Sequence, residues 1–136
     1  MKKILAITLT LLLCICLFSC NTPENTDVWS TATYTDDIEI GQGEKTVAVL
    51  VTAEEKTVTL TVKTNENTLG NALLTLDLIN NKGGLFDTVI GIKADFSKNE
   101  AWWKFCDAEG NALMYGVFDA EINDGEIFKF VYTIGF

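Results

Sequence analysis

Residues 46–64 read TVAVLVTAEEKTVTLTVKT and contain two β-branched runs on either side of a short polar stretch. The runs are residues 46–52 and 57–64, and the second alternates strictly between polar and apolar residues. Alternation with a period of two is typical of a strand with one buried face. Because only residues 53–56 lie between the runs, we predict that they form an antiparallel hairpin.

The segment after this hairpin has helical spacing. Thr68 is a good N-cap residue, and the apolar residues that follow it recur at steps of three and four: Leu69, Ala72, Leu73 and Leu76. We therefore predict a helix over residues 68–79, about three turns long, before the glycine pair at 83–84. Residues 74–78 also alternate, so a strand at this point is the other interpretation.

The remaining apolar stretches have strand character. Residues 85–92 form an apolar run with a glycine at 91, and residues 102–106 and 112–118 flank the turn sequence DAEGN. Residues 127–134 alternate and form the last predicted strand. A hairpin, one helix and these strands indicate an α+β fold of β-grasp type, in which one helix packs across a mixed sheet. The order of the later strands stays open.

The N-terminus has the pattern of an export signal. Lys2 and Lys3 precede an apolar run at residues 4–18, and the chain turns polar directly after Cys20. About 15 apolar residues are too few for a typical membrane-spanning helix, which needs ~20, but they fit the core of a signal peptide. Ser19 directly before Cys20, with Leu17 three positions before that cysteine, resembles the lipobox of bacterial lipoproteins.

In bacterial lipoproteins this cysteine receives a diacylglycerol, the preceding peptide is cleaved and the new N-terminus is acylated. The resemblance implies that Cys20 is lipidated and that the chain is exported and anchored to the cell membrane, with its domain outside the cytoplasm. It divides the chain into a lipoprotein signal peptide (1–19), the lipidated Cys20 with a polar tether (20–43) and a folded domain (44–136). A plain secretory signal or an uncleaved anchor is the alternative. Parts of the tether can pack on the domain as an extra strand.

The composition excludes several classes of function. The 136 residues carry 10 basic side chains, all of them lysine, against 19 acids, and the net charge is −9 without any Arg or His. Histidine-dependent nucleophiles, histidine metal sites and arginine phosphate clamps are therefore impossible within this chain, and its acidity disfavours nucleic acid. Once the signal peptide is cleaved and Cys20 is lipidated, Cys106 is the only free thiol. We predict no enzymatic activity, no metal site and no cofactor.

Several motifs occur in a characteristic order along residues 45–134: TVTLTVKT (57–64), TLGNALL (68–74), WKF (103–105), Leu113, Gly116-Val117 and Asp124-Gly125. In this order and spacing they resemble the transcobalamin-like C-terminal domain family, which occurs in many bacterial lipoproteins and is named after vertebrate cobalamin carriers. The resemblance implies a small β-rich, β-grasp-like lid that covers one face of cobalamin. In the vertebrate carriers a larger helical domain holds the other face.

The resemblance also implies where a ligand would bind. The aromatic stretch of the family matches Trp102 and Trp103, which point to opposite faces of a strand, so that one can be core and the other exposed. An exposed indole suits a flat ring system. Together with neighbouring residues, these matches give seven candidate ligand-binding residues: Phe86, Trp102, Trp103, Leu113, Tyr115, Gly116 and Val117. We expect Trp102 and Tyr115 to lie on one partly exposed apolar face, on adjacent strands. The structural alternative is that Trp103 is core and Gly116 only marks a bulge.

Two functions follow as hypotheses. The first is a surface lipoprotein that binds a small ligand, a corrinoid or another vitamin-like molecule, for delivery to a membrane importer. The second is a non-catalytic domain, tethered at the membrane surface, that interacts with a protein or a cell-surface polymer through an exposed sheet edge or the Trp102 surface.

Overall fold

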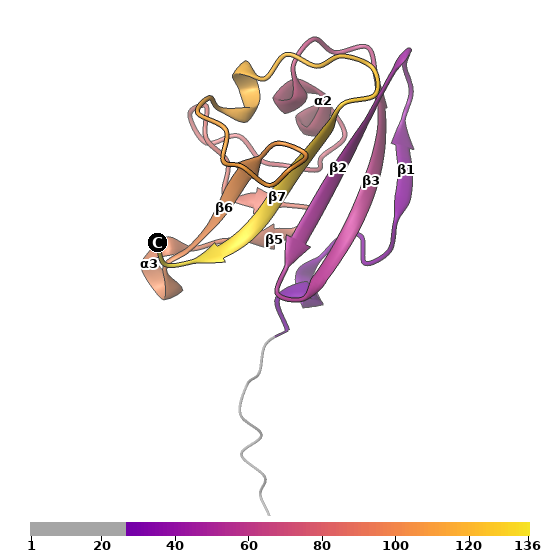
Figure 1. The fold of residues 1–136 in the computed structure, drawn as a ribbon. Coiled ribbons are helices and arrows are strands. Elements are labelled where there is room, and N and C mark those ends of the chain that lie inside the picture. The colour runs from indigo at the N-terminus through magenta and orange to yellow at the C-terminus, as the bar shows by residue number, and fades with distance from the viewer. Residues whose placement is uncertain (1–26) are drawn as a thin grey trace, which may run out of the picture.

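The computed structural model of the chain describes residues 27–136. The predicted signal peptide, Cys20 and the first part of the tether lie outside the described residues. Within residues 27–136, no helix is both long and apolar enough to cross a membrane. The described chain folds around a five-stranded sheet whose inner face is covered by helices and loops (Figure 1).

The predicted hairpin is confirmed. Strand β2 (Lys45–Ala53) pairs antiparallel with β3 (Lys56–Thr64), with Thr52 opposite Thr57 across the turn. Val47, Val49 and Val51 of β2 are fully buried, whereas Ala48 and Leu50 between them lie on the other face and are partly exposed. Burial alternates in the same way along β3, where the alternation is also visible in the sequence, so every second residue of the hairpin belongs to the inner face of the sheet.

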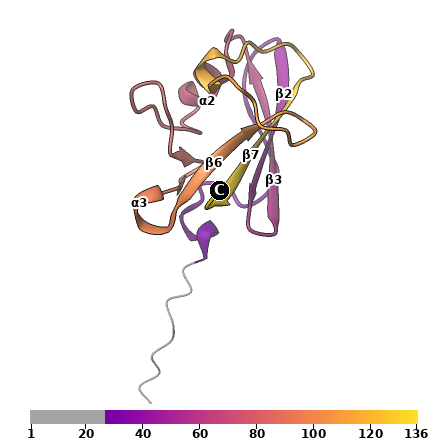
Figure 2. The same ribbon diagram turned by 60° about the vertical axis from the view of Figure 1, so that its left-hand side comes forward.

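The other three strands complete a mixed sheet in the order β1-β3-β2-β7-β6. Strand β7 (Ile127–Ile134) lies parallel to β2, whereas β6 (Ala101–Cys106) lies antiparallel to β7. The first strand of the hairpin thus lies beside the last strand of the chain, which is the β-grasp arrangement. A mixed sheet with one helix packed across it was the predicted fold class, and the structure confirms it (Figure 2).

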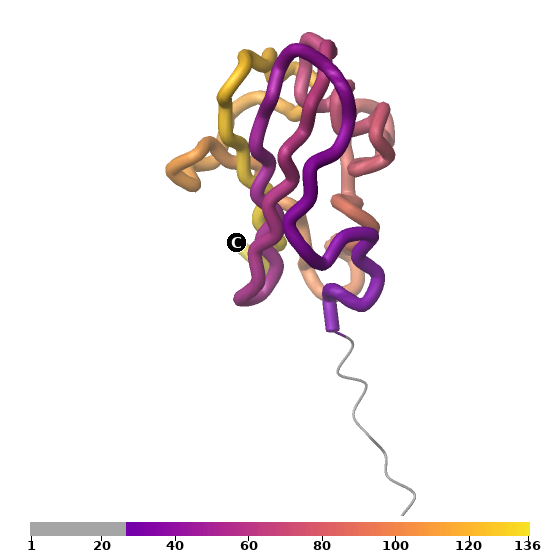
Figure 3. Tube along the Cα trace, turned by 90° about the vertical axis from the view of Figure 1, so that its right-hand side faces the viewer, coloured from indigo at the N-terminus to yellow at the C-terminus, as the bar shows by residue number. Residues whose placement is uncertain are grey.

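The packed unit begins earlier than the predicted domain boundary at 44. Strand β1 (Ile38–Gly41), within the predicted tether, lies parallel to β3 at the edge of the sheet, so the expected extra strand exists. The 3-10 helix η2 (Val28–Thr31) buries Trp29, whose indole N–H donates to the carbonyl of Ala53 at 3.1 Å. In the view from this edge, β1 and the hairpin lie nearest the reader (Figure 3).

Helix α2 (Leu69–Thr75) is shorter than the predicted helix over 68–79. Thr68 caps its start, accepting a hydrogen bond from the Asn71 N–H at 3.3 Å. At the other end Asp77 has a φ of 60°, and the N–H of Leu78 donates to the carbonyl of Leu73 at 2.8 Å. These are the features of a Schellman motif, which ends a helix. Asp77 occupies the positive-φ position at which a glycine is usual. Because the sequence has no glycine there, the predicted helix extends past the observed end at Thr75.

The predicted strand over 85–92 is wrong. Two short strands, β4 (Thr88–Val89) and β5 (Ile92–Lys93), form a separate antiparallel pair instead. The turn between them is Ile90-Gly91, and both residues have positive φ, as a two-residue hairpin turn of type I′ requires. Ile90 is held there by backbone hydrogen bonds, because its N–H donates to Leu78 and its carbonyl accepts from Thr33.

The predicted strand over 112–118 is also wrong. Its pairing with β6 is limited to a bridge between Cys106 and Ala112 and a hydrogen bond from the Leu113 N–H to the Phe105 carbonyl. The chain then turns into the 3-10 helix η3 (Val117–Asp119), which packs against α2 and buries Val117. The packing of η3 against α2, with Val117 buried, prevails over the capacity of residues 112–118 to extend the sheet.

Candidate functional site

The candidate site is a groove of about 430 Å³ beside β6, which we call the β6 groove. Its walls come from β6, from the loop before β4, and from the segment that joins β5 to helix α3 (Phe96–Asn99). The residues that line it are Lys82, Phe86, Asp87, Lys93, Ala94, Asp95, Phe96, Ser97, Ala101, Trp102 and Trp103.

Two adjacent tryptophans of β6 contribute to this groove from opposite faces of the sheet. Trp103 faces inward, is only 7% exposed and donates its indole N–H to the carbonyl of Ile92 at 3.2 Å. Its ring meets Tyr132 edge to face, with 5.3 Å between centroids. Trp102 is half-buried on the other face, opposite Thr133, and donates its indole N–H to the carbonyl of Gly135 at 2.6 Å. The strand alternation thus makes Trp103 a core residue and leaves Trp102 partly accessible.

The structure brings Phe86 together with these two tryptophans. Phe86 is half-buried, and its ring stands edge to face on that of Phe130, 5.3 Å between centroids. Phe130 is fully buried at the centre of the core. The aromatic part of the groove therefore rests on the buried core, and aromatic side chains offer a contact surface for a flat ring system.

The other four predicted ligand-binding residues do not line this groove. Leu113 and Tyr115 line a second hollow of about 280 Å³, next to the 107–111 turn, and Tyr115 is 49% exposed there. Gly116 is exposed, Val117 is buried in the core, and neither lines one of the two hollows. The expectation that Trp102 and Tyr115 share one face on adjacent strands is wrong, because residues 112–118 leave the sheet after Ala112.

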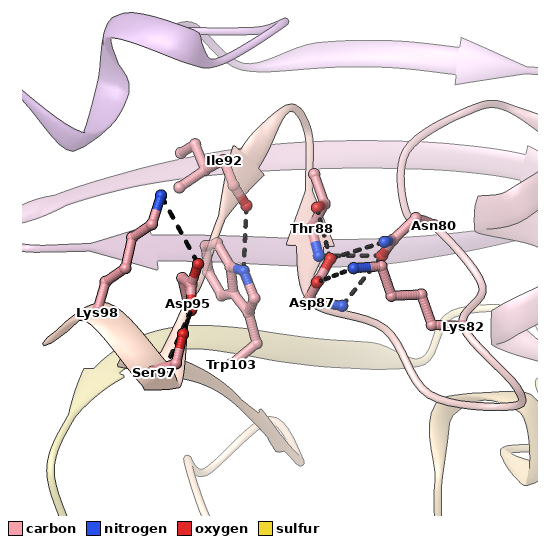
Figure 4. A network of polar contacts seen from close by, with 9 residues as sticks. All are labelled: Asn80, Lys82, Asp87, Thr88, Ile92, Asp95, Ser97, Lys98 and Trp103. Atoms are coloured by element: carbon pink, nitrogen blue, oxygen red, sulfur yellow. Dashed lines mark hydrogen bonds and ion pairs between the residues drawn. The ribbon is translucent and has the colours of Figure 1, made fainter. Parts of the chain in front are cut away.

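One polar wall of the β6 groove is a network around Asp87 (Figure 4). Its carboxylate accepts hydrogen bonds from Lys82 Nζ at 2.7 Å, Asn80 Nδ2 at 2.7 Å and Thr88 Oγ1 at 2.8 Å. Desolvation raises the pKa of Asp87, but the hydrogen bonds from Lys82, Thr88 and Asn80 outweigh it and lower the pKa from 3.8 to about 2. This carboxylate is therefore charged and fully partnered at neutral pH.

The opposite wall is held by Asp95, which caps helix α3. Its Oδ1 accepts from the Ser97 N–H at 3.1 Å and from the Ser97 hydroxyl at 2.6 Å, and its Oδ2 lies 3.9 Å from Lys98 Nζ. The hydroxyl of Ser97 is the main reason that the pKa of Asp95 is lowered. Figure 4 shows Trp103 between this cluster and the network around Asp87.

Sequence reasoning missed Lys82 and Asp95 as groove residues. Asp95-Phe-Ser-Lys has the pattern of a short capped helix, and that signal was available. The contact between Lys82 and Asp87 had no comparable signal, since it depends on how the loop before β4 folds back on itself.

The groove combines aromatic side chains with charged and polar ones. Asp87 and Asp95 are each partnered by a lysine. Cys106 is fully buried, and burial raises the pKa of its thiol. Among residues 27–136, no three side chains of the metal-binding types gather closely enough to hold a metal ion.

Comparison with known proteins finds similarity only at the level of structure. No family model matches the chain, and no curated protein matches it. A candidate metal binding protein from Ruminococcus gnavus ATCC 29149 has a TM-score of 0.62 and 23% sequence identity, and the match covers 68% of this chain and 100% of that one. Haptocorrin in complex with Cbi has a TM-score of 0.52 and 16% identity, over 71% of this chain and 27% of haptocorrin.

Both likenesses concern the fold of this chain. At such identities they show a shared fold and nothing finer. The likeness to haptocorrin supports a distant transcobalamin-like fold relation, and this chain spans about a quarter of the haptocorrin chain. The resemblance seen in the sequence is therefore supported for the fold.

Proposed function

We propose that this chain is a non-catalytic binding protein of the transcobalamin-like C-terminal domain family and that its β6 groove holds a small ligand. The ligand is a corrinoid or another flat, vitamin-like molecule. In this proposal the protein is exported, anchored to the membrane through a lipid on Cys20, and passes its ligand to a membrane importer.

The observation that carries the proposal is the composition of the groove. Three of the seven residues singled out for ligand binding, Phe86, Trp102 and Trp103, line one groove of about 430 Å³, within the usual size range of small-molecule sites. Its acidic side chains already have partners, so an uncharged or weakly charged ligand would meet no unpaired carboxylate there. The fold likeness to haptocorrin, which is seen in complex with Cbi, supports the same class of ligand.

Isothermal titration of the chain with cobinamide and with cobalamin tests the proposal. We expect saturable binding in the micromolar to millimolar range, because an open groove covers only one face of a large flat ligand. Trp102→Ala should weaken binding about tenfold or more, since it removes an aromatic contact at the groove. Circular dichroism must show that the variant is folded.

Tyr115→Ala is the matched control, because it removes an exposed aromatic ring from the second hollow. It should leave corrinoid affinity unchanged. Binding that depends on Tyr115 and not on Trp102 would move the site to the second hollow. Absence of binding at millimolar corrinoid would contradict the proposal.

The alternative is a domain that interacts with a protein or polymer at the membrane surface. One observation favours it: Met114 is 98% exposed and is followed in the chain by Tyr115, which lines the second hollow together with the exposed Ile127. Apolar side chains that form a contiguous exposed patch commonly mark protein contacts. The corrinoid titration distinguishes the two functions.

A further inference from the structure

One end of the molecule carries large apolar side chains that nothing in the described chain covers. Phe96 is 47% exposed, Ile134 is 64% exposed and Phe136 is fully exposed, with the rings of Phe96 and Phe136 5.7 Å apart. The hydrogen bond from the Trp102 indole to Gly135 fixes the segment that carries Phe136. Trp102 and Ile134 point to opposite faces of the sheet but lie at the same end of it. We call the four residues at this end, Phe96, Trp102, Ile134 and Phe136, the apolar end.

The described chain begins near the same end. Helix η2 packs against β5, and β5 leads within two residues to the cap of α3. The Thr33 N–H donates to the Ile90 carbonyl at 2.7 Å, which fixes the start of the chain to the β4–β5 turn. Figures 1 and 2 show η2, α3 and the C-terminus toward one end of the molecule, away from α2.

The distance from this end to Cys20 is limited by chain length. Seven residues, 20–26, precede Asp27, and seven residues span at most about 25 Å when fully extended. A lipid on Cys20 would therefore keep the start of the described chain, and with it the apolar end, close to the bilayer. This step rests on the anchor that forms part of the proposed function.

We infer that the apolar end docks on the lipid bilayer, with Phe96, Trp102, Ile134 and Phe136 in its interfacial region. Aromatic and aliphatic side chains gathered at one end of a protein can enter the interfacial region together, and tryptophan favours this region because its ring is apolar and its N–H is polar. Phe96 and Trp102 also line the β6 groove, so docking would place the groove at the membrane surface.

The charges around the apolar end determine which bilayer it fits. Acidic residues outnumber the lysines there: Asp27, Glu54, Glu55, Asp95 and Glu100 against Lys56, Lys93 and Lys98. Anionic headgroups would repel this surface, so the apolar side chains must drive the contact. The docking surface therefore favours zwitterionic over anionic lipid.

Vesicle binding by the unlipidated chain, made as residues 20–136 with Cys20→Ser, tests docking apart from the anchor. We expect it to co-sediment with phosphatidylcholine vesicles and less with phosphatidylglycerol vesicles, where added salt should increase binding. Ile134→Ser with Phe136→Ser should lower partitioning about tenfold or more, because both lose apolar contact area. Neither residue lines the β6 groove, so corrinoid affinity should not change.

The matched control removes apolar residues from the opposite end. Ile127 begins β7, the strand on which Ile134 is last, and Met114 lies beyond the other end of β6. Ile127→Ser with Met114→Ser should bind vesicles like the unaltered chain. Hydrogen exchange on phosphatidylcholine vesicles should show new protection at residues 93–104 and 132–136 only.

Three outcomes would overturn the inference. One is equal vesicle binding by both double variants, and another is the absence of any vesicle binding and of any new protection. The third is a dimer in sedimentation that Ile134→Ser with Phe136→Ser dissociates, because a second copy would then cover this surface. If the protein is not lipidated on Cys20 in the cell, the anchor is refuted. The vesicle experiment with the Cys20→Ser chain would still test docking, because it does not depend on the lipid.

Discussion

Trp102 and Trp103 are adjacent on β6, yet their indoles point to opposite faces of the sheet and donate hydrogen bonds to different parts of the chain. Trp103 donates to Ile92 in the separate β4–β5 pair, whereas Trp102 donates to Gly135 after the last strand. The first bond ties the sheet to the loops that form the groove, and the second holds the C-terminal residues. Two neighbouring residues of one type therefore have different structural roles.

The two tryptophans should differ in their effect on stability. Trp103→Ala removes a buried ring and should lower the free energy of unfolding by about 3–5 kcal/mol. Trp102→Ala removes a half-buried ring and one hydrogen bond, and should cost about 1–2 kcal/mol. Urea denaturation followed by circular dichroism measures both. Equal losses would show that the indoles are equally important to the core.

Gly70→Ala should destabilise the protein although alanine is the better helix former. A Cβ at Gly70 would lie 2.8 Å from the Cα of Phe118, so α2 and η3 would have to move apart. We expect a loss of about 1–3 kcal/mol, which exceeds the gain of up to about 1 kcal/mol from helix propensity. Asn71→Ala, at an exposed position of the same helix, is the control for propensity. A thermal melt of Gly70→Ala at or above the wild-type midpoint would refute this packing argument.

The sequence predicts well the strands in which polar and apolar residues alternate, because the alternation corresponds to the exposed and buried faces of the strand. Strand β3 alternates between polar and apolar residues over residues 57–64, and the structure gives β7 the predicted bounds, Ile127–Ile134. The short turn between β2 and β3 leaves few other pairings. Such strands can be predicted because the sheet environment is the same at every second residue.

The sequence predicts poorly those segments whose conformation depends on contacts with residues distant in the chain. Ile90, at positive φ, is held by hydrogen bonds with Leu78 and Thr33, and Val117 is buried against α2. The apolar runs at residues 85–92 and 112–118 are each compatible with a strand in the sequence. Tertiary packing is what prevents them from forming one. For the same reason the predicted ligand-binding residues do not all lie at one site. Phe86 lines the β6 groove with the two tryptophans, whereas Tyr115 lies in the 112–118 segment, outside the sheet, and lines the second hollow.

The network around Asp87 should make stability depend on acid pH. Its pKa of about 2 in the folded chain lies below the ordinary value of 3.8, so the carboxylate binds protons more tightly when unfolded. Its contribution, up to about 2 kcal/mol, is therefore present above pH ~4 and is lost as the pH falls toward 2. Thermal unfolding at a series of pH values from 6 to 2 measures this loss.

Asp87→Asn isolates this contribution from those of the other acids. The pKa values of Asp95 and Asp107 are also lowered, so the wild-type chain loses stability in acid for several reasons. The variant should be less stable than wild type at pH 6, and the difference should narrow toward pH 2. A difference that stays constant over this range would mean that Asp87 acts through packing and not through its charge.

The lipid anchor can be tested independently of any ligand. Expressed in a bacterial host, the mature chain should begin at Cys20, partition into detergent and carry the mass of its acyl chains. Cys20→Ala should leave the precursor uncleaved or release an unmodified chain. Cys106→Ala is the control: its thiol is fully buried and its pKa is raised, so the acyl mass should be unchanged. A soluble, unmodified chain that begins beyond Cys20 would contradict the lipobox interpretation, because cleavage at that point leaves no thiol to anchor.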